Sequence, residues 1–226
     1  MKFENTDVWG FEHAIRGMRN PMNSWERSDT TYGLGEDYLN DMEIGQNDYN
    51  LMARLINGGS EHRKFLRQIF VSVDITAPMY WWSEFDTYKV GTTANSTSKM
   101  HKLAQTPITI DCFETDDMER HLVWSSTSHN LPWSITATVE TFIVTLEYLR
   151  IKYLETKDKK YWKELIRWLP ESWLQTRTIT MNYENLRNMY FQRKNHKLTE
   201  WSESFIKWVE SLPYAKELIM YTGENE

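Results

Sequence analysis

The chain has little cysteine and no long apolar run. A single cysteine, Cys112, stands among 226 residues, so neither an internal disulfide nor a cysteine-based zinc site is expected, and the chain suits a reducing compartment. The first seven residues carry no apolar run behind a basic head, so no secretory signal is predicted. No stretch reaches the length of about 20 apolar residues that crosses a bilayer. We therefore expect a cytoplasmic protein without a membrane partner.

An excess of basic residues is also lacking. The 26 lysines and arginines face 32 aspartates and glutamates, which gives a formal net charge of −6. Such a balance disfavours non-specific nucleic-acid binding as the main role, although one local basic pocket for a phosphate is compatible with it. Four histidines have no second ligand at helical spacing, so no metal site is predicted: His13, His101, His121 and His129.

Neither a repeat period nor a low-complexity tract interrupts the sequence. We interpret residues 1–226 as one domain, with an irregular N-terminal wrap over residues 1–45 and a core over residues 48–212. The wrap is rich in asparagine, aspartate, glycine and serine and poor in apolar periodicity, so loops and short helices are expected there.

Apolar spacing predicts helices over residues 48–57, 134–155, 159–168, 186–192 and 200–211. Asp48 is the expected N-cap of the first helix, and Pro78 is expected in the first turn of an aromatic helix that reaches Tyr88. Alternation predicts a strand with one buried side over residues 65–75, and threonine-rich residues 172–181 predict another. This order indicates an α/β or α+β domain with a modest sheet.

Several short motifs follow one another along the core. They are Ser60-Glu61-His62, Tyr80-Trp81-Trp82, Leu169-Pro170 and Thr180-Met181-Asn182, with Arg193 eleven positions after the asparagine. In order and spacing this set resembles the flavin-dependent thymidylate synthases, over roughly residues 48–212. The resemblance implies the thymidylate synthase-complementing-protein fold, a small antiparallel sheet flanked by long helices.

The sequence departs from that family at Glu184 and Asn188, where members carry an arginine and a histidine, and most strongly in one earlier segment. Members carry an Arg-His-Arg motif that helps to position the flavin and the nucleotide, whereas this chain reads Ser83 to Lys89 there and has no arginine or histidine between Arg67 and His101. Neutral hydroxyls cannot reproduce the contacts of guanidinium forks. Fold is therefore implied more firmly than cofactor binding.

The substituted segment admits two interpretations of its own. Residues 89–98 combine one lysine, several hydroxyls, an asparagine and Gly91, which are groups that can surround a phosphate. The alternative is a polar loop whose hydroxyls cap a helix or satisfy their own backbone. Arg193 likewise either holds a nucleotide phosphate or complements the dipole at a helix C-terminus.

The resemblance implies a set of site residues, which we state as predictions. Phosphate contacts are assigned to Arg193, Lys89, Ser96 and Ser98, base or ribose contacts to Asn182 and Asn188, and cofactor contacts to His62 and Asn95. His62 could instead form a local pair with Glu61, and the pair Trp81–Trp82 is expected in the core or at a subunit interface. No catalytic residue is assigned.

Two hypotheses for function remain open from the sequence. In the first, the protein binds a pyrimidine deoxynucleotide and FAD in a homotetramer and, if active, methylates dUMP to dTMP with a folate and NADPH as further partners. In the second, the same scaffold is catalytically inactive and serves as a binding or structural protein.

Overall fold

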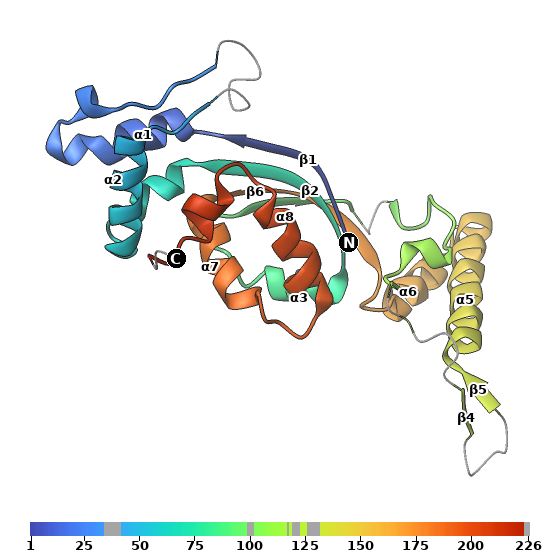
Figure 1. Cartoon of the computed structure of the whole chain (residues 1–226). Helices are drawn as coiled ribbons and strands as arrows, with labels where there is room; N and C mark the ends of the chain where they lie inside the picture. The colour runs from blue at the N-terminus through green and yellow to red at the C-terminus, as the bar shows by residue number, and fades with distance from the viewer. Residues whose placement is uncertain (34–41, 99–101, 117, 119–122, 126–131, 224–226) are drawn as a thin grey trace. The chain divides into compact units, whose positions relative to one another are not determined.

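The computed structural model describes the chain except residues 34–41, 99–101, 117, 119–122, 126–131 and 224–226 (Figure 1). The chain divides into two compact units. The middle unit comprises residues 76–85 and 96–177 together with Met1, and the terminal unit comprises residues 2–75, 86–95 and 178–226. Each unit is described by itself below.

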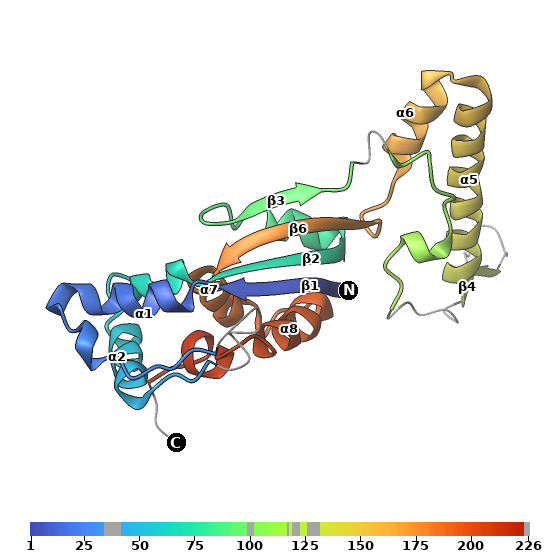
Figure 2. The ribbon, with the colours of Figure 1, turned by 90° about the horizontal axis from the view of Figure 1, so that it is seen from above.

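A four-stranded sheet has the order β1-β2-β6-β3. Its strands are β1 (Lys2–Trp9), β2 (Phe70–Pro78), β6 (Leu174–Asn182) and β3 (Thr93–Ser96), and neighbouring strands run in opposite directions (Figure 2). A small antiparallel sheet was predicted from the resemblance, and this prediction is confirmed.

Strand β1 corrects the prediction that residues 1–45 are loops and short helices. Its eight residues are mostly exposed, and Val8 is its buried member. Phe3 lies 4.9 Å from Trp208 in a stacked arrangement, which packs the strand against the C-terminal helices. The sequence pattern is weak because this edge strand buries few side chains.

Strand β2 confirms the expected alternation but begins later than predicted. Val71, Val73 and Ile75 are fully buried on one side of the strand. Residues Arg63–Gln68 form a 3-10 helix, η3, so the predicted start at residue 65 is wrong. The apolar residues of η3 are buried as well, and the sequence pattern therefore does not distinguish the two elements.

The terminal unit contains most of the shorter helices. These are α1 (Phe11–Arg19), the 3-10 turns η1 (Asn20–Met22) and η2 (Trp25–Arg27), α2 (Gln46–Asn57), α7 (Tyr183–Arg193), the π-helix η5 (Glu200–Phe205), α8 (Ile206–Glu210) and the π-helix η6 (Ala215–Ile219). The N-cap of α2 is Gly45, so Asp48 is not the cap that the sequence predicted. Asp48 lies inside the first turn and is fully buried.

The middle unit holds α3 (Met79–Phe85), the 3-10 turn η4 (Ile110–Cys112), α5 (Ile135–Thr156) and α6 (Lys159–Trp168), with a hairpin of β4 (Val123–Ser125) and β5 (Pro132–Ser134). The predicted bounds of α6 are confirmed. Ser134 begins α5 as a true N-cap, since its Oγ accepts a hydrogen bond from the Ala137 amide at 3.0 Å. A cluster of buried apolar residues forms the core between these helices: Leu103, Ile108, Phe113, Leu146 and Leu165.

Trp81 and Trp82 are core residues of the middle unit. Both are fully buried, and their rings meet edge to face with centroids 4.9 Å apart. The Trp82 indole N–H donates to the carbonyl of Gln175 at 2.9 Å, and the Arg177 guanidinium lies 4.3 Å from the Trp82 ring. Of the two alternatives left open by the sequence, the structure supports the core.

No helix in the described part of the chain is both long enough and apolar enough to cross a membrane. Among the same residues, no group of three or more histidine, cysteine, aspartate or glutamate side chains is arranged to hold a metal ion.

Candidate functional site

The segment Asp86–Asn95 lies along α7 in the terminal unit and is fixed to both ends of that helix. Near the start of α7, the Asn185 amide donates to the carbonyl of Val90 at 2.8 Å. Near its end, the Tyr88 hydroxyl donates to Gln192 Oε1 at 2.9 Å. The substituted segment and the helix that carries Asn182 and Arg193 are therefore neighbours, as the sequence hypothesis required.

Gly91 allows this close approach. Its φ is +78°, and a Cβ at this position would lie 2.8 Å from Asn185 Oδ1 and 3.2 Å from Asn182 Nδ2. A side chain would therefore meet both the unfavourable backbone region and the two asparagine amides. Glycine lets the loop contact the N-terminus of α7 directly.

Asn182 is the N-cap of α7. Its side-chain oxygen accepts a hydrogen bond from the Asn185 amide N–H at 2.9 Å, and the Asn185 side chain accepts one from the Asn182 N–H at 3.2 Å, so the two form a reciprocal capping box. Asn182 is 8 % exposed, and its Nδ2 makes no hydrogen bond to any described residue. The side-chain oxygen of Asn182, which was predicted to contact the base or ribose, is used to cap the helix. The two N–H donors of its Nδ2 are not used in the cap.

Arg193 ends α7 between two aromatic rings. Its Nε donates to the Tyr88 hydroxyl at 2.8 Å, and its guanidinium lies 5.4 Å from the Tyr88 ring and 4.6 Å from the ring of Trp201. Such cation–π contacts stabilise and orient a guanidinium. Because eleven residues correspond to about three helical turns, Arg193 and Asn182 lie on the same side of α7.

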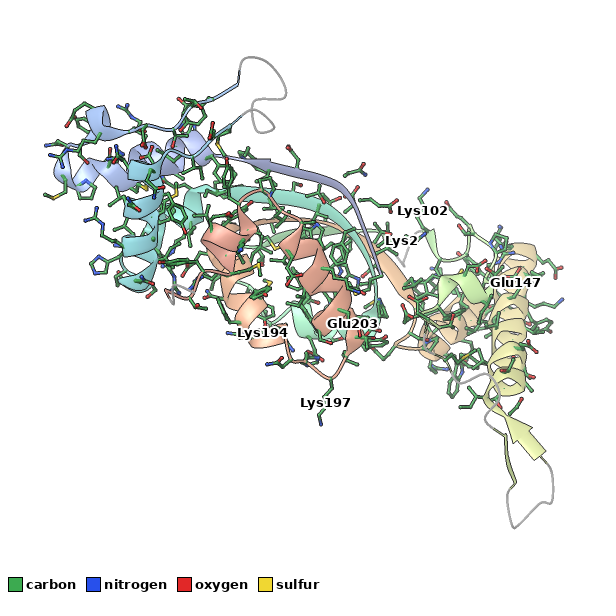
Figure 3. All side chains as sticks on the ribbon, in the orientation of Figure 1. Lys2, Lys102, Glu147, Lys194, Lys197 and Glu203 are labelled. Atoms are coloured by element: carbon green, nitrogen blue, oxygen red, sulfur yellow. The ribbon has the colours of Figure 1, made fainter. Side chains whose placement is uncertain are left out.

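The other positive residues after Arg193 are solvated. Lys194 and Lys197 are exposed, and Lys197 points away from the ribbon (Figure 3). His196 Nδ1 accepts a hydrogen bond from the amide of Leu198 at 3.2 Å. Arg193 is thus the residue of this run that the fold holds in place.

The remaining predicted contacts are spread along the chain. Lys89 is exposed in the loop beside α7, Asn188 is exposed on α7, and Asn95 is exposed in β3. Ser96 and Ser98 belong to the middle unit, where Ser96 is exposed and the Ser98 carbonyl accepts from Lys102. Lys89, Asn95, Asn182, Asn188 and Arg193 share the terminal unit.

His62 lies just before η3 and is exposed. Its neighbour Glu61 pairs with Lys64 at 3.5 Å. His62 belongs to the terminal unit, as does the nearby partly buried ion pair of Arg63 and Glu184.

The ion pair joins η3 to the first turn of α7. Arg63 Nε donates to both carboxylate oxygens of Glu184, at 3.1 and 2.9 Å, and Glu184 is buried. Arg187 is also buried and donates from Nη1 to the carbonyl of Ile219 at 2.7 Å. Burial lowers the pKa of Arg187 and the charge of Arg63 lowers it further, while Glu184 acts in the opposite direction.

Comparisons with known proteins bear on the fold. No protein-family model matches the chain, and no curated protein matches its sequence. Two solved structures of flavin-dependent thymidylate synthase ThyX from Helicobacter pylori, each complexed with FAD and dUMP, do match. Their TM-scores are 0.64 and 0.67, at 17% and 16% sequence identity; both cover 97% of this chain, and the alignments span 98% and 97% of theirs.

The chain has the fold of the flavin-dependent thymidylate synthases. The likeness extends over nearly the whole length of both proteins, which is more than the residues 48–212 that the sequence motifs suggested. At this level of identity the likeness establishes the fold alone.

Within this thymidylate synthase fold, sequence reasoning missed the residues that hold the predicted ones in place. Tyr88 and Trp201 position Arg193, and Asn185 completes the cap of Asn182. The three-residue spacing of Asn182 and Asn185 is that of a capping box and was the one available signal. No sequence signal indicated the role of Trp201, because its contact with Arg193 depends on how the C-terminal helices pack.

Proposed function

We propose that the protein binds a pyrimidine deoxynucleotide beside α7, with Arg193 and Lys89 contacting the phosphate and Asn182 and Asn188 contacting the base or ribose. The observation that carries this proposal is the fixed guanidinium of Arg193 on the same side of α7 as the unused Nδ2 donors of Asn182. A preorganised guanidinium loses little freedom on binding an oxyanion. Ser96 and Ser98 belong to the middle unit and are left out of this proposal.

The fit of FAD is weaker than that of a mononucleotide. Of the residues predicted for the cofactor, His62 and Asn95 are exposed and Asn95 is uncharged. Among the described residues near His62, the Arg63 guanidinium is committed to Glu184. A diphosphate would need cations that these residues do not supply. Flavin binding should therefore be tested first. Methylation of dUMP to dTMP, which would also require a folate and NADPH, is the activity to test if flavin binds.

Arg193→Ala is expected to weaken dUMP binding by about ten- to a hundredfold, because a charge-assisted hydrogen bond to a phosphate contributes about 1.5–3 kcal/mol. Isothermal titration calorimetry measures this change. Lys194→Ala is the matched control, since it removes the adjacent exposed cation, and should change the affinity less than about twofold. Absence of dUMP binding to the unmodified protein would refute the proposal, and the visible absorption spectrum tests flavin separately.

A second candidate, a binding or structural role, is favoured by one face of α5. Four apolar side chains spaced three and four residues apart are solvent-exposed there: Val144, Tyr148, Ile151 and Leu154, with exposures of 68, 54, 40 and 38%. A helix that is apolar on its exposed side usually packs against a partner. We propose a second copy of the chain as that partner, consistent with the homotetramer that the resemblance implies.

Val144→Glu with Ile151→Glu is expected to reduce the assembly by at least one step, for example from tetramer to dimer. Multi-angle light scattering after gel filtration measures the mass. The control Thr138→Glu with Thr145→Glu adds the same charges at exposed positions on another side of the helix and should leave the mass unchanged. An unmodified protein that is monomeric at about 50 µM would contradict self-association through α5.

A further inference from the structure

The terminal unit contains a hollow whose lining includes no residue of α7. It has a volume of about 620 Å³ and is lined by residues of α1, η1, η2 and α2, which are drawn in blue at the left of Figure 1. Its size falls within the range of sites for small molecules, about 300–1,000 Å³. None of the residues predicted from the sequence to bind nucleotide or flavin lines it.

The lining combines guanidinium groups with apolar and amide side chains. Arg19, Arg27 and Arg54 supply the positive charges, and Glu26 is the carboxylate of the lining. The apolar contribution comes from Met18, Met22 and Leu51, and the amides are Asn47 and Asn50. Met22 is 82% exposed, so its side chain is accessible to a ligand from the solvent side.

Two of the three arginines are available to a ligand. Arg27 and Arg54 are exposed, and within the described residues neither forms an ion pair. The Arg54 Nε donates to the Asn50 carbonyl at a long 3.4 Å, and its two terminal nitrogens donate to no other described residue. Asn47, Asn50, Leu51 and Arg54 follow the helical spacing of one side of α2, so they form a continuous wall.

Arg19 is the buried member of this set and is incompletely satisfied. It is 4% exposed, and its Nε donates to Asp48 Oδ1 at 2.6 Å while Nη1 donates to the Ser24 carbonyl at 3.2 Å. Its Nη2 is buried and has no hydrogen-bond partner among the residues that the structure describes. A buried, unsatisfied guanidinium nitrogen is costly, and an anion with an acceptor at this position would relieve that cost.

We propose that this hollow binds a small organic phosphate, with the phosphate held by Arg27 and Arg54 near Arg19 and an apolar group of the ligand against Met22 and Leu51. Paired guanidinium forks suit the oxygens of a phosphate dianion. Methionine side chains adapt to the shape of an apolar group, and their sulfur makes favourable contacts with aromatic rings. The site is separate from the proposed nucleotide site and does not depend on it.

Phenyl phosphate is the probe, because it carries a phosphate and an apolar ring without a nucleoside. Isothermal titration calorimetry should show saturable binding to the full-length protein. Arg27→Gln and Arg54→Gln should each weaken it about tenfold and together about a hundredfold. Arg16→Gln is the matched control: Arg16 is exposed on α1 and lies over the Trp25 ring, outside the lining, so its loss should change the affinity less than twofold.

Titrations with two related compounds separate the contribution of the ring to binding from that of the phosphate. Inorganic phosphate should bind more weakly than phenyl phosphate, and benzyl alcohol should not bind. Arg193→Ala should leave phenyl phosphate binding to this hollow unchanged. The proposal is overturned if phenyl phosphate shows no saturable binding at millimolar concentration, or if it binds the folded Arg27→Gln, Arg54→Gln double variant as tightly as the unmodified protein. Circular dichroism confirms that the variant is folded.

Discussion

Replacement of Glu184 by alanine is expected to lower the free energy of unfolding by about 3–5 kcal/mol. Glu184 is 6% exposed and accepts both hydrogen bonds of Arg63 Nε. Arg187 is buried nearby, and its pKa responds to the charges of both residues. Without the carboxylate, two guanidinium groups repel each other where water screens them poorly.

Urea unfolding followed by tryptophan fluorescence measures the loss. Glu61→Ala is the matched control, because Glu61 pairs with Lys64 at 3.5 Å with both side chains exposed, and should cost less than about 1 kcal/mol. Adding Arg63→Met to Glu184→Ala should recover part of the stability, since it removes one uncompensated charge. A loss below about 1 kcal/mol for Glu184→Ala alone would show that the pair contributes little.

The same pair shows what the sequence could and could not predict. A glutamate at position 184, where the family has an arginine, indicates from the sequence only that a contact has been lost. Its partner, Arg63, is 121 positions away along the chain, and no periodicity connects the two. The structure shows that Glu184 forms an ion pair between η3 and α7.

Helices of the middle unit were predicted well because their signals are local. The bounds of α6 follow from the apolar spacing within the helix and from Pro170 just beyond it. Strand β1 and the position of Asp48 were missed because each is determined by packing between distant segments. Asn182 illustrates a third case, in which a residue assigned to a ligand also caps a helix. Only the structure shows that the side chain predicted to contact a ligand is also the helix cap.

Asp48→Ala is the second substitution with a large expected effect. Asp48 is fully buried and accepts hydrogen bonds from Arg19 Nε at 2.6 Å, the Ser28 hydroxyl at 2.7 Å, and the Thr30 hydroxyl and amide at 2.7 and 3.1 Å. Alanine would leave Arg19 buried without its counter-charge, so the expected loss is about 3–5 kcal/mol. Asp7→Ala, at an exposed position of β1, is the control and should stay within about 0.5 kcal/mol.

The contribution of Asp48 also depends on pH. Burial acts to raise the pKa of Asp48, but hydrogen bonds from Thr30, Ser28 and Arg19 outweigh it, so the pKa in the folded protein lies below the ordinary value. A carboxyl group whose pKa is depressed by folding stabilises the protein fully above its unfolded pKa, which is about 3.9. That stabilisation is lost as the pH falls through the folded pKa.

Comparison with Asp48→Asn isolates this effect from the other carboxylates whose pKa is lowered, such as Glu147 beside Arg150. The difference in free energy of unfolding between the unmodified protein and Asp48→Asn should be constant from about pH 7 to about pH 5 and shrink below about pH 4. A difference that stays constant down to about pH 3 would mean that the charge of Asp48 does not stabilise the fold. In that case the hydrogen-bonding shape of the side chain, which asparagine largely keeps, would hold α1 and α2 together, and the cost of Asp48→Ala would come from lost acceptors.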